Sequence, residues 1–146
     1  MPGRAYGGQH CSVAGALEVV GERWTFLIVR DALLGKARFD SFLSGLAIAR
    51  NVLTDRLNTL VQNGIFERVP YQDRPVRHEY RLTAKGRELI PIIVSLMEWG
   101  DRYCADENGP QRVALHADCG GQVRSYLVCA SCARPLPPDE VVTVSR

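Results

Sequence analysis

Three polar residues near the start of one short segment have the chemistry needed to read DNA bases. Arg50 can donate two hydrogen bonds to guanine, Asn51 can pair in the same way with adenine, and Thr54 adds a short donor and acceptor. The same segment carries apolar residues at helical spacing, namely Leu53, Leu57, Leu60 and Val61. A helix that enters the major groove needs one face for docking and one polar face. We therefore predict a recognition helix within residues 48–64, ended by Gly64.

Basic residues continue beyond this helix, into a segment that reads as a hairpin. Eight basic against four acidic residues give residues 50–87 a local charge of +4, although the net charge of the whole chain is only +2. Such a concentration is typical of a surface that meets phosphates. We expect Arg56 to contact backbone phosphate, and Arg74 and Arg77, at or beside the hairpin tip, to reach a flanking minor groove or backbone. A surface helix beside a solvated hairpin is the alternative.

The C-terminal segment carries four residues that could hold a metal ion. They form two pairs with two residues between the members, His116 with Cys119 and Cys129 with Cys132. Four soft or borderline ligands are a closed tetrahedral set for Zn²⁺, so we expect a structural rather than a catalytic zinc ion. A segment with few apolar side chains also needs a stabilising cross-link such as a bound metal ion in order to fold. Free thiols or a labile disulfide are the alternatives.

Cys11 stands alone near the N-terminus, directly before Ser12. We expect Ser12 to cap the first helix, which would place the Cys11 thiol at a helix N-terminus. A thiol in such a position can become reactive toward oxidants, with His10 beside it, so Cys11 is a candidate redox-sensing residue. The alternative is a small buried apolar side chain.

These residues are held by a predictable order of elements. Apolar spacing predicts helices over about residues 12–20, 22–34 and 38–44 before the recognition helix. Alternation predicts strands over 65–71 and 76–82 with a turn at 72–75, and Thr83 then caps a helix over about 84–103, kinked at Pro91. The fold class is thus mainly α (α+β), a winged helix-turn-helix. We divide the chain into an arm (1–11), a DNA-binding and dimerisation domain (12–105), a linker (106–115) and a zinc-ribbon-like tail (116–146).

The residues from Cys11 to Tyr103 resemble the HxlR family of bacterial transcription regulators, relatives of the MarR-type winged-helix proteins. The resemblance rests on the order and spacing of several motifs, which are Gly21-Glu22-Arg23-Trp24-Thr25, Arg38-Phe39-Asp40-Ser41-Phe42, residues 48–57, Asn63-Gly64-Ile65, residues 71–80 and residues 82–89. It implies a homodimer whose two recognition helices address successive turns of a palindromic double-stranded DNA operator. Some such regulators use a single N-terminal cysteine to sense oxidants or electrophiles, which the resemblance extends to Cys11.

The last predicted helix gives an independent reason to expect a homodimer. It carries more apolar side chains than a domain of this size can cover, namely Leu89, Ile92, Ile93, Leu96 and Tyr103. Two DNA-reading helices about 34 Å apart also require two subunits. Ordinary packing within one chain is the alternative. We expect a repressor that responds to a redox, electrophile or small-molecule signal.

Composition and motifs limit the other classes of function. The 146 residues are 46% hydrophobic and 23% charged, as in ordinary globular proteins, and contain no apolar run long enough to cross a membrane. No secretory signal is recognisable, so we expect a cytoplasmic protein with no membrane partner. A zinc-dependent nucleobase deaminase would need His-x-Glu and Pro-Cys-x-x-Cys, and His116-Ala117-Asp118 and Ala130-Ser131 lack these features. A protein-binding winged-helix or zinc-ribbon module is a further alternative, which the basic polar face disfavours.

Overall fold

The computed structural model describes residues 11–144, so the predicted arm lies outside the described residues except for Cys11. The chain divides into two compact units, one up to Leu89 and one from Ile90 onward. This division places the last long helix with the tail, whereas the sequence pattern assigned that helix to the DNA-binding domain. Each unit is described by itself.

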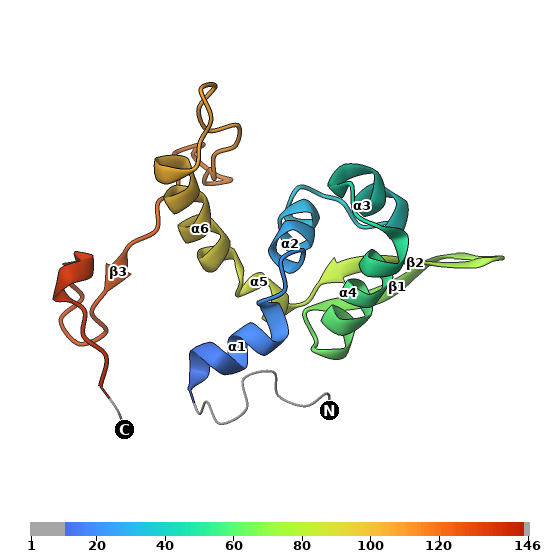
Figure 1. The fold of residues 1–146 in the computed structure, drawn as a ribbon, viewed down its shortest axis with the longest axis horizontal. Helices are drawn as coiled ribbons and strands as arrows, with labels where there is room; N and C mark the ends of the chain where they lie inside the picture. The colour runs from blue at the N-terminus through green and yellow to red at the C-terminus, as the bar shows by residue number, and fades with distance from the viewer. Residues whose placement is uncertain (1–10, 145–146) are drawn as a thin grey trace. The chain divides into compact units, whose positions relative to one another are not determined.

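The first unit is an α+β winged helix, as expected from the sequence (Figure 1). Its elements are α1 (Ser12–Val20), α2 (Thr25–Leu33), α3 (Phe39–Leu46), α4 (Arg50–Gln62), β1 (Phe66–Asp73), β2 (Val76–Leu82) and α5 (Ala84–Arg87). Strands β1 and β2 pair antiparallel in a hairpin that projects away from the helices. This hairpin is the wing.

One face of α4 is fixed in the core of this unit. Leu53, Leu57 and Leu60 are at most 1% exposed, as their spacing predicted. Phe42 of α3 and Phe66 of β1 are equally buried and meet edge to face at 6.4 Å between ring centroids. Helix α4 is therefore held between α3 and the wing, and it ends before Gly64, whose φ of +71° suits a residue without a Cβ.

The wing is longer and more tightly turned than the sequence pattern predicted. Asp73 pairs with Val76, so only Arg74 and Pro75 form the turn, and the register shifts at Tyr71. A single β-bridge also forms beside β2, because Arg38 pairs with Glu79 and Tyr80 N donates to Ala37 O at 2.7 Å. This bridge joins the wing to the start of α3.

The cap of the first helix differs from the prediction. Ser12 is the first residue of α1, and the N-cap is Cys11, whose Sγ accepts a hydrogen bond from Ala14 N at 3.3 Å. A sulfur acceptor is weaker than a hydroxyl oxygen, but only the residue at position 11 has the extended backbone that a cap requires. The second predicted cap is confirmed, since Thr83 Oγ1 accepts from Gly86 N at 3.0 Å.

The single long helix predicted over residues 84–103 is wrong. The helical pattern stops after Arg87 and restarts as α6 (Ile90–Tyr103), about 21 Å long at 1.5 Å per residue. Pro91 explains the restart, because proline lacks an N–H and restricts the residue before it, and is tolerated only in a first turn. None of the helices in residues 11–144 has the length and apolar character needed to span a membrane.

The rest of the second unit consists of short elements after α6. Strand β3 (Leu127–Val128) pairs antiparallel with β4 (Pro135–Leu136), and a 3-10 helix, η1 (Pro138–Glu140), follows. A smaller hairpin precedes them, in which Leu115 bridges to Gln122. Strands of two residues have little stability of their own.

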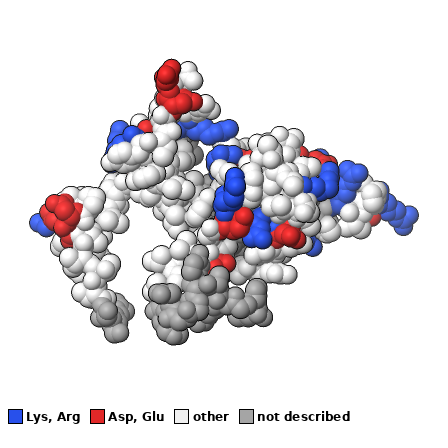
Figure 2. Space-filling view, viewed as in Figure 1, with Lys and Arg blue, Asp and Glu red and all other residues white. Residues whose placement is uncertain are grey.

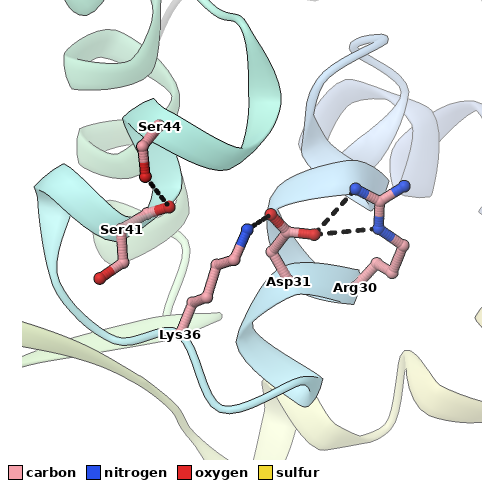
Figure 3. Close-up of polar contacts among 5 residues, drawn as sticks. All are labelled: Arg30, Asp31, Lys36, Ser41 and Ser44. Carbon is pink, nitrogen blue, oxygen red and sulfur yellow. Dashed lines mark hydrogen bonds and ion pairs between the residues drawn. The ribbon is translucent and has the colours of Figure 1, made fainter.

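A buried carboxylate links α2 to the loop before α3 (Figure 3). Asp31 is 1% exposed, and it accepts hydrogen bonds from Arg30 Nη2 at 2.8 Å and from Lys36 Nζ at 2.7 Å. Burial raises its pKa, but the hydrogen bonds from Lys36 and Arg30 outweigh this, so the pKa of Asp31 lies below its ordinary value of 3.8. Gly45 of α3 leaves the necessary space, because a Cβ there would lie 1.9 Å from Lys36 Nζ.

Replacing this carboxylate should destabilise the chain at neutral pH. We predict that Asp31→Ala lowers the free energy of unfolding by about 2 kcal/mol, because charged hydrogen bonds are lost while Arg30 and Lys36 can still reach water. A lowered pKa stabilises the fold above the unfolded value of about 3.9 and ceases to do so as the pH falls through the folded value. Urea unfolding should therefore show a deficit at pH 7 that shrinks below pH 4.

Asp40→Ala is the matched control, because the Asp40 side chain is 82% exposed and lies 3.9 Å from Arg50 Nη2. We expect it to change the free energy of unfolding by no more than about 0.5 kcal/mol. Equal effects of the two substitutions, or an Asp31→Ala deficit that is the same at pH 3 and pH 7, would contradict this account.

Candidate nucleic-acid interface

The predicted base-reading residues lie on the outward face of α4. Arg50, Asn51 and Thr54 are all exposed, Asn51 and Thr54 on the side facing away from the buried leucines and Arg50 at the first residue of the helix. Ala49 provides the extended backbone that starts the helix, and Thr54 Oγ1 donates to Arg50 O at 2.9 Å. The first turn of α4 therefore presents side chains rather than a capping group, and its free N–H groups add a partial positive charge.

Arg50 lies over the start of α3. Its guanidinium is 5.2 Å from the centroid of the Phe39 ring, and its Nη2 is 3.9 Å from Asp40 Oδ1. Both charged side chains are more than two-thirds exposed, so this ion pair is weak and easily exchanged for another partner. Phe39 orients the guanidinium without burying it.

A surface hollow connects α3 to the wing. It has a volume of about 440 Å³ and is lined by Arg38, Phe39, Asp40, Ser41, Tyr71, Arg77, His78 and Tyr80. Arg77 shares this hollow with the two residues that contact Arg50. The hollow therefore connects Arg77 of the wing to the residues of α3 that lie against the start of α4.

The tip of the wing carries basic side chains that form no ion pair with the described part of the protein. Arg74 and Arg77 are exposed, and within residues 11–144 neither makes an ion pair. Figure 2 shows basic side chains over the projecting end of the hairpin. Arg56, in the middle of α4, is half-buried and has less freedom to reach a ligand.

Other basic residues brace the wing, a role that sequence reasoning missed. Arg38 Nε lies 3.4 Å and Arg81 Nη2 lies 2.8 Å from the Glu79 carboxylate, and Arg38 also stacks 4.1 Å from the Tyr71 ring centroid. The hydrogen bond from Arg81 is the main cause that holds the pKa of Glu79 below its ordinary value. In the sequence, Glu79 lies two residues from both Arg77 and Arg81, so the three side chains share one face of the strand. This spacing is the signal that could have indicated an ion pair within the wing.

Two further contacts fix α4 to the wing and to α5. Arg68 of β1 hydrogen bonds to Asn58 of α4, and Lys85 Nζ donates to Asn63 O at 2.7 Å. Gly86 lets α5 approach closely, because a Cβ there would lie 2.3 Å from Ile65 O. The helix and the wing are thus held as one rigid surface.

The cysteines and histidine of interest lie at exposed or half-exposed positions. Cys11 is exposed, so it is not the buried apolar side chain of the alternative interpretation. In the second unit His116 Nδ1 lies 3.1 Å from Cys119 Sγ. Backbone N–H groups of Cys132 and Ser131 donate to the Cys129 sulfur and lower its pKa. Within residues 11–144 no three of these groups come together.

Comparison with known proteins identifies the family to which the chain is related. Residues 19–108 match the model of the HxlR-like helix-turn-helix family. An uncharacterized HTH-type transcriptional regulator of Mycobacterium tuberculosis is 47% identical over 130 residues, which cover 89% of this chain and 82% of that protein.

Solved structures show the same similarity. The crystal structure of PA1607, a candidate transcription factor, has a TM-score of 0.82 and 37% identity over 95% of this chain and 96% of that one. The redox regulator HypR in its oxidised form has a TM-score of 0.61 and 34% identity over 66% of this chain and all of that one. The family and these relatives exclude the enzyme alternative. The chain belongs to the HxlR family of helix-turn-helix transcriptional regulators, and DNA is its partner.

Proposed function

We propose that this chain is a homodimeric, cytoplasmic repressor that binds a palindromic operator through α4 and the wing. The observation that carries the proposal is the continuity of one surface. Arg50 contacts Phe39 and Asp40, and those two residues line the same hollow as Arg77. Major groove and flanking backbone are adjacent in B-DNA, so a single rigid surface can contact both.

The residues of this surface would divide the work between specificity and affinity. Arg50, Asn51 and Thr54 would contact base edges, because they are exposed on the first turns of a helix whose other face is buried. Arg56 would contact phosphate beside the helix, and Arg74 and Arg77 would bind the minor groove or backbone from the wing. Asp40 would release Arg50 when a base or phosphate takes its place.

An exposed apolar seam on α6 supports the homodimer. Ile92, Leu96, Trp99 and Tyr103 are between 50% and 65% exposed and follow one another at intervals of four, three and four residues. This is the spacing at which two helices interlock side chains along their length. The rings of Trp99 and Tyr103 also contact each other in a tilted arrangement, with their centroids 5.4 Å apart, which makes a broad aromatic end to the seam. A second copy of the same helix is the occupant we propose.

Cys11 is the residue through which we propose that oxidants act. Its Sγ accepts the Ala14 N–H at the start of α1, and the side chain is exposed, so an oxidant can reach the sulfur. The relative HypR is a redox regulator. Hydrogen peroxide would transfer one oxygen to the thiol sulfur to give a sulfenic acid, and the second peroxide oxygen would leave as water. The oxidised sulfur would no longer serve as the cap of α1.

Substitutions on α4 and on the wing should affect DNA binding differently. Arg50→Ala should cost about 1–3 kcal/mol on the operator and little on random duplex, because base contacts are lost. Arg77→Ala should weaken both duplexes alike and reduce the slope of log affinity against log salt by about one. Fluorescence anisotropy at several salt concentrations measures both effects. Arg134→Ala, which removes a charge from the tail, is the control, and equal losses on both duplexes for Arg50→Ala would refute its role.

A charge placed in the α6 seam should separate the subunits. We predict that Leu96→Glu raises the dimer dissociation constant at least hundredfold, about 3 kcal/mol, because two carboxylates would be buried in an apolar contact. Sedimentation velocity across a concentration range measures this, and operator affinity should fall with it. Asp101→Ala, an exposed change off the seam, is the control. If Leu96→Glu stays dimeric at the same concentrations as the wild type, this seam is not the interface.

Oxidation should act on DNA binding through Cys11. We predict that peroxide changes operator affinity of the wild-type protein and of Cys104→Ala, but not of Cys11→Ser, which keeps an acceptor at the cap. Mass spectrometry after trapping of sulfenic acid should locate the added oxygen on Cys11. An unchanged response in Cys11→Ser would rule this sensor out.

A further inference from the structure

The tail contains two turns whose function the DNA-binding surface does not explain. In the first, His116 N donates to Gly121 O at 2.8 Å and Gly120 N donates to His116 O at 2.8 Å. Gly120 has a φ of +70°, and Gly121 N donates to Cys119 Sγ at 3.4 Å. The turn therefore holds the imidazole and the thiol on the same side of a tight loop.

The second turn repeats the first position by position. Cys129 N donates to Arg134 O at 3.0 Å, and Ala133 N donates to Cys129 O at 2.8 Å. Ala133, the equivalent of Gly120, has a φ of +56° although it carries a Cβ. A strained backbone of this kind is kept where a site requires it. The same loop thus presents Cys129 and Cys132 as the first loop presents His116 and Cys119.

Each turn has the form of half a zinc site. In a tetrahedral site the Zn–S bond is about 2.3 Å long and the Zn–N bond about 2.1 Å. These lengths place a sulfur and a nitrogen ligand of the same zinc ion roughly 3.6 Å from each other. His116 Nδ1 and Cys119 Sγ are 3.1 Å apart, within half an ångström of that spacing. A disulfide between Cys129 and Cys132 would not explain why the other turn has the same backbone hydrogen bonds but carries His116 with Cys119.

One chain does not bring the two halves together. Within residues 11–144 no group of three or more potential ligands forms. Between the turns Ser125 is tethered to α6, because its N–H donates to Glu98 Oε2 at 2.9 Å and its hydroxyl hydrogen bonds to Ser95. Two ligands fill only half of the coordination that a structural zinc ion requires. Cys119 and Cys132 are exposed, so each half is open to another molecule.

We propose that Zn²⁺ is bound between two subunits, with His116 and Cys119 from one chain and Cys129 and Cys132 from the other. This inference rests on the dimer proposed above. Ser95 and Glu98, which hold Ser125, alternate along α6 with Leu96 and Trp99 of the seam. A second copy paired along the seam would therefore bring its tail to the same helix, and the two-fold symmetry would create two equal sites. Four protein ligands leave no open position, so the zinc ion ties the subunits together and does not catalyse a reaction.

Mixed dimers of the full-length chain test this arrangement. One chain, carrying one affinity tag, has His116→Ala and Cys119→Ala, and the other, carrying a second tag, has Cys129→Ala and Cys132→Ala. Coexpression and purification on both tags in turn isolates only dimers with one chain of each kind. Zinc is then measured by elemental analysis, and Co²⁺ substitution reports tetrahedral thiolate coordination by its visible absorption. Cys104→Ala is the control, because it removes a thiol that is not among the four proposed zinc ligands.

We expect about one zinc ion per subunit in the wild type and in Cys104→Ala, and none in either variant purified alone. The mixed dimer should hold half the wild-type zinc, because one of its two shared sites is intact. A mixed dimer without zinc beside a zinc-loaded wild type would place the site within one chain and overturn the shared arrangement. A zinc-free wild-type dimer that still binds operator DNA would overturn the metal site alone. Failure of the two chains to co-purify would overturn the dimer and the shared site together.

Discussion

The burial of one face of α4 is the constraint on which the rest of the first unit depends. Leu53, Leu57 and Leu60 are at most 1% exposed, and the helix can turn about its axis only if all three leave the core. Because 3.6 residues complete a turn, this fixes Asn51 and Thr54 away from the core, whereas Arg50 is exposed because it lies in the first turn, at the end of the helix. The polar face therefore owes its orientation to apolar packing and not to any polar contact of its own.

Positive charge in this unit has two separate uses. One group of basic side chains makes hydrogen bonds within the protein and so joins the wing to α3, α4 and α5. This group consists of Arg38, Arg68, Arg81 and Lys85. Arg74 and Arg77 lie beyond these braces and stay exposed. A cation that already has a carboxylate partner gains less from a phosphate than an unpaired one. The braces therefore hold the wing in place for the cations at its tip.

The sequence pattern predicted correctly those features that depend only on residues close together in the chain. The leucine spacing of α4, the Gly64 stop and the Thr83 cap each depend on residues within one or two turns, and the structure confirms them. The broken helix before Ile90 was missed because a proline in a first turn and a proline that kinks a helix look alike in sequence. Cys11 was missed as the cap because Ser12 is the better capping residue and only the backbone decides the position.

Features that depend on distant parts of the chain could not be predicted. Asp31 resembles an ordinary charged residue on a helix, and it is buried because Lys36 and Gly45 come from the loop and helix that follow. Nothing in the sequence indicated that Arg38 would form a β-bridge and an ion pair with Glu79, 41 residues away. The two pairs of the tail, His116 with Cys119 and Cys129 with Cys132, were evident from their spacing, but spacing alone could not show that no three of these side chains come together within residues 11–144.

The central claim is that two copies of this surface read duplex DNA as a symmetric pair. Selection of bound sequences from random double-stranded DNA tests it most directly, because base preference and stoichiometry emerge from one experiment. The account predicts a two-fold symmetric site whose half-sites are about 10 base pairs apart from centre to centre. Enrichment of a single asymmetric site, or no enrichment over the starting pool, would contradict it.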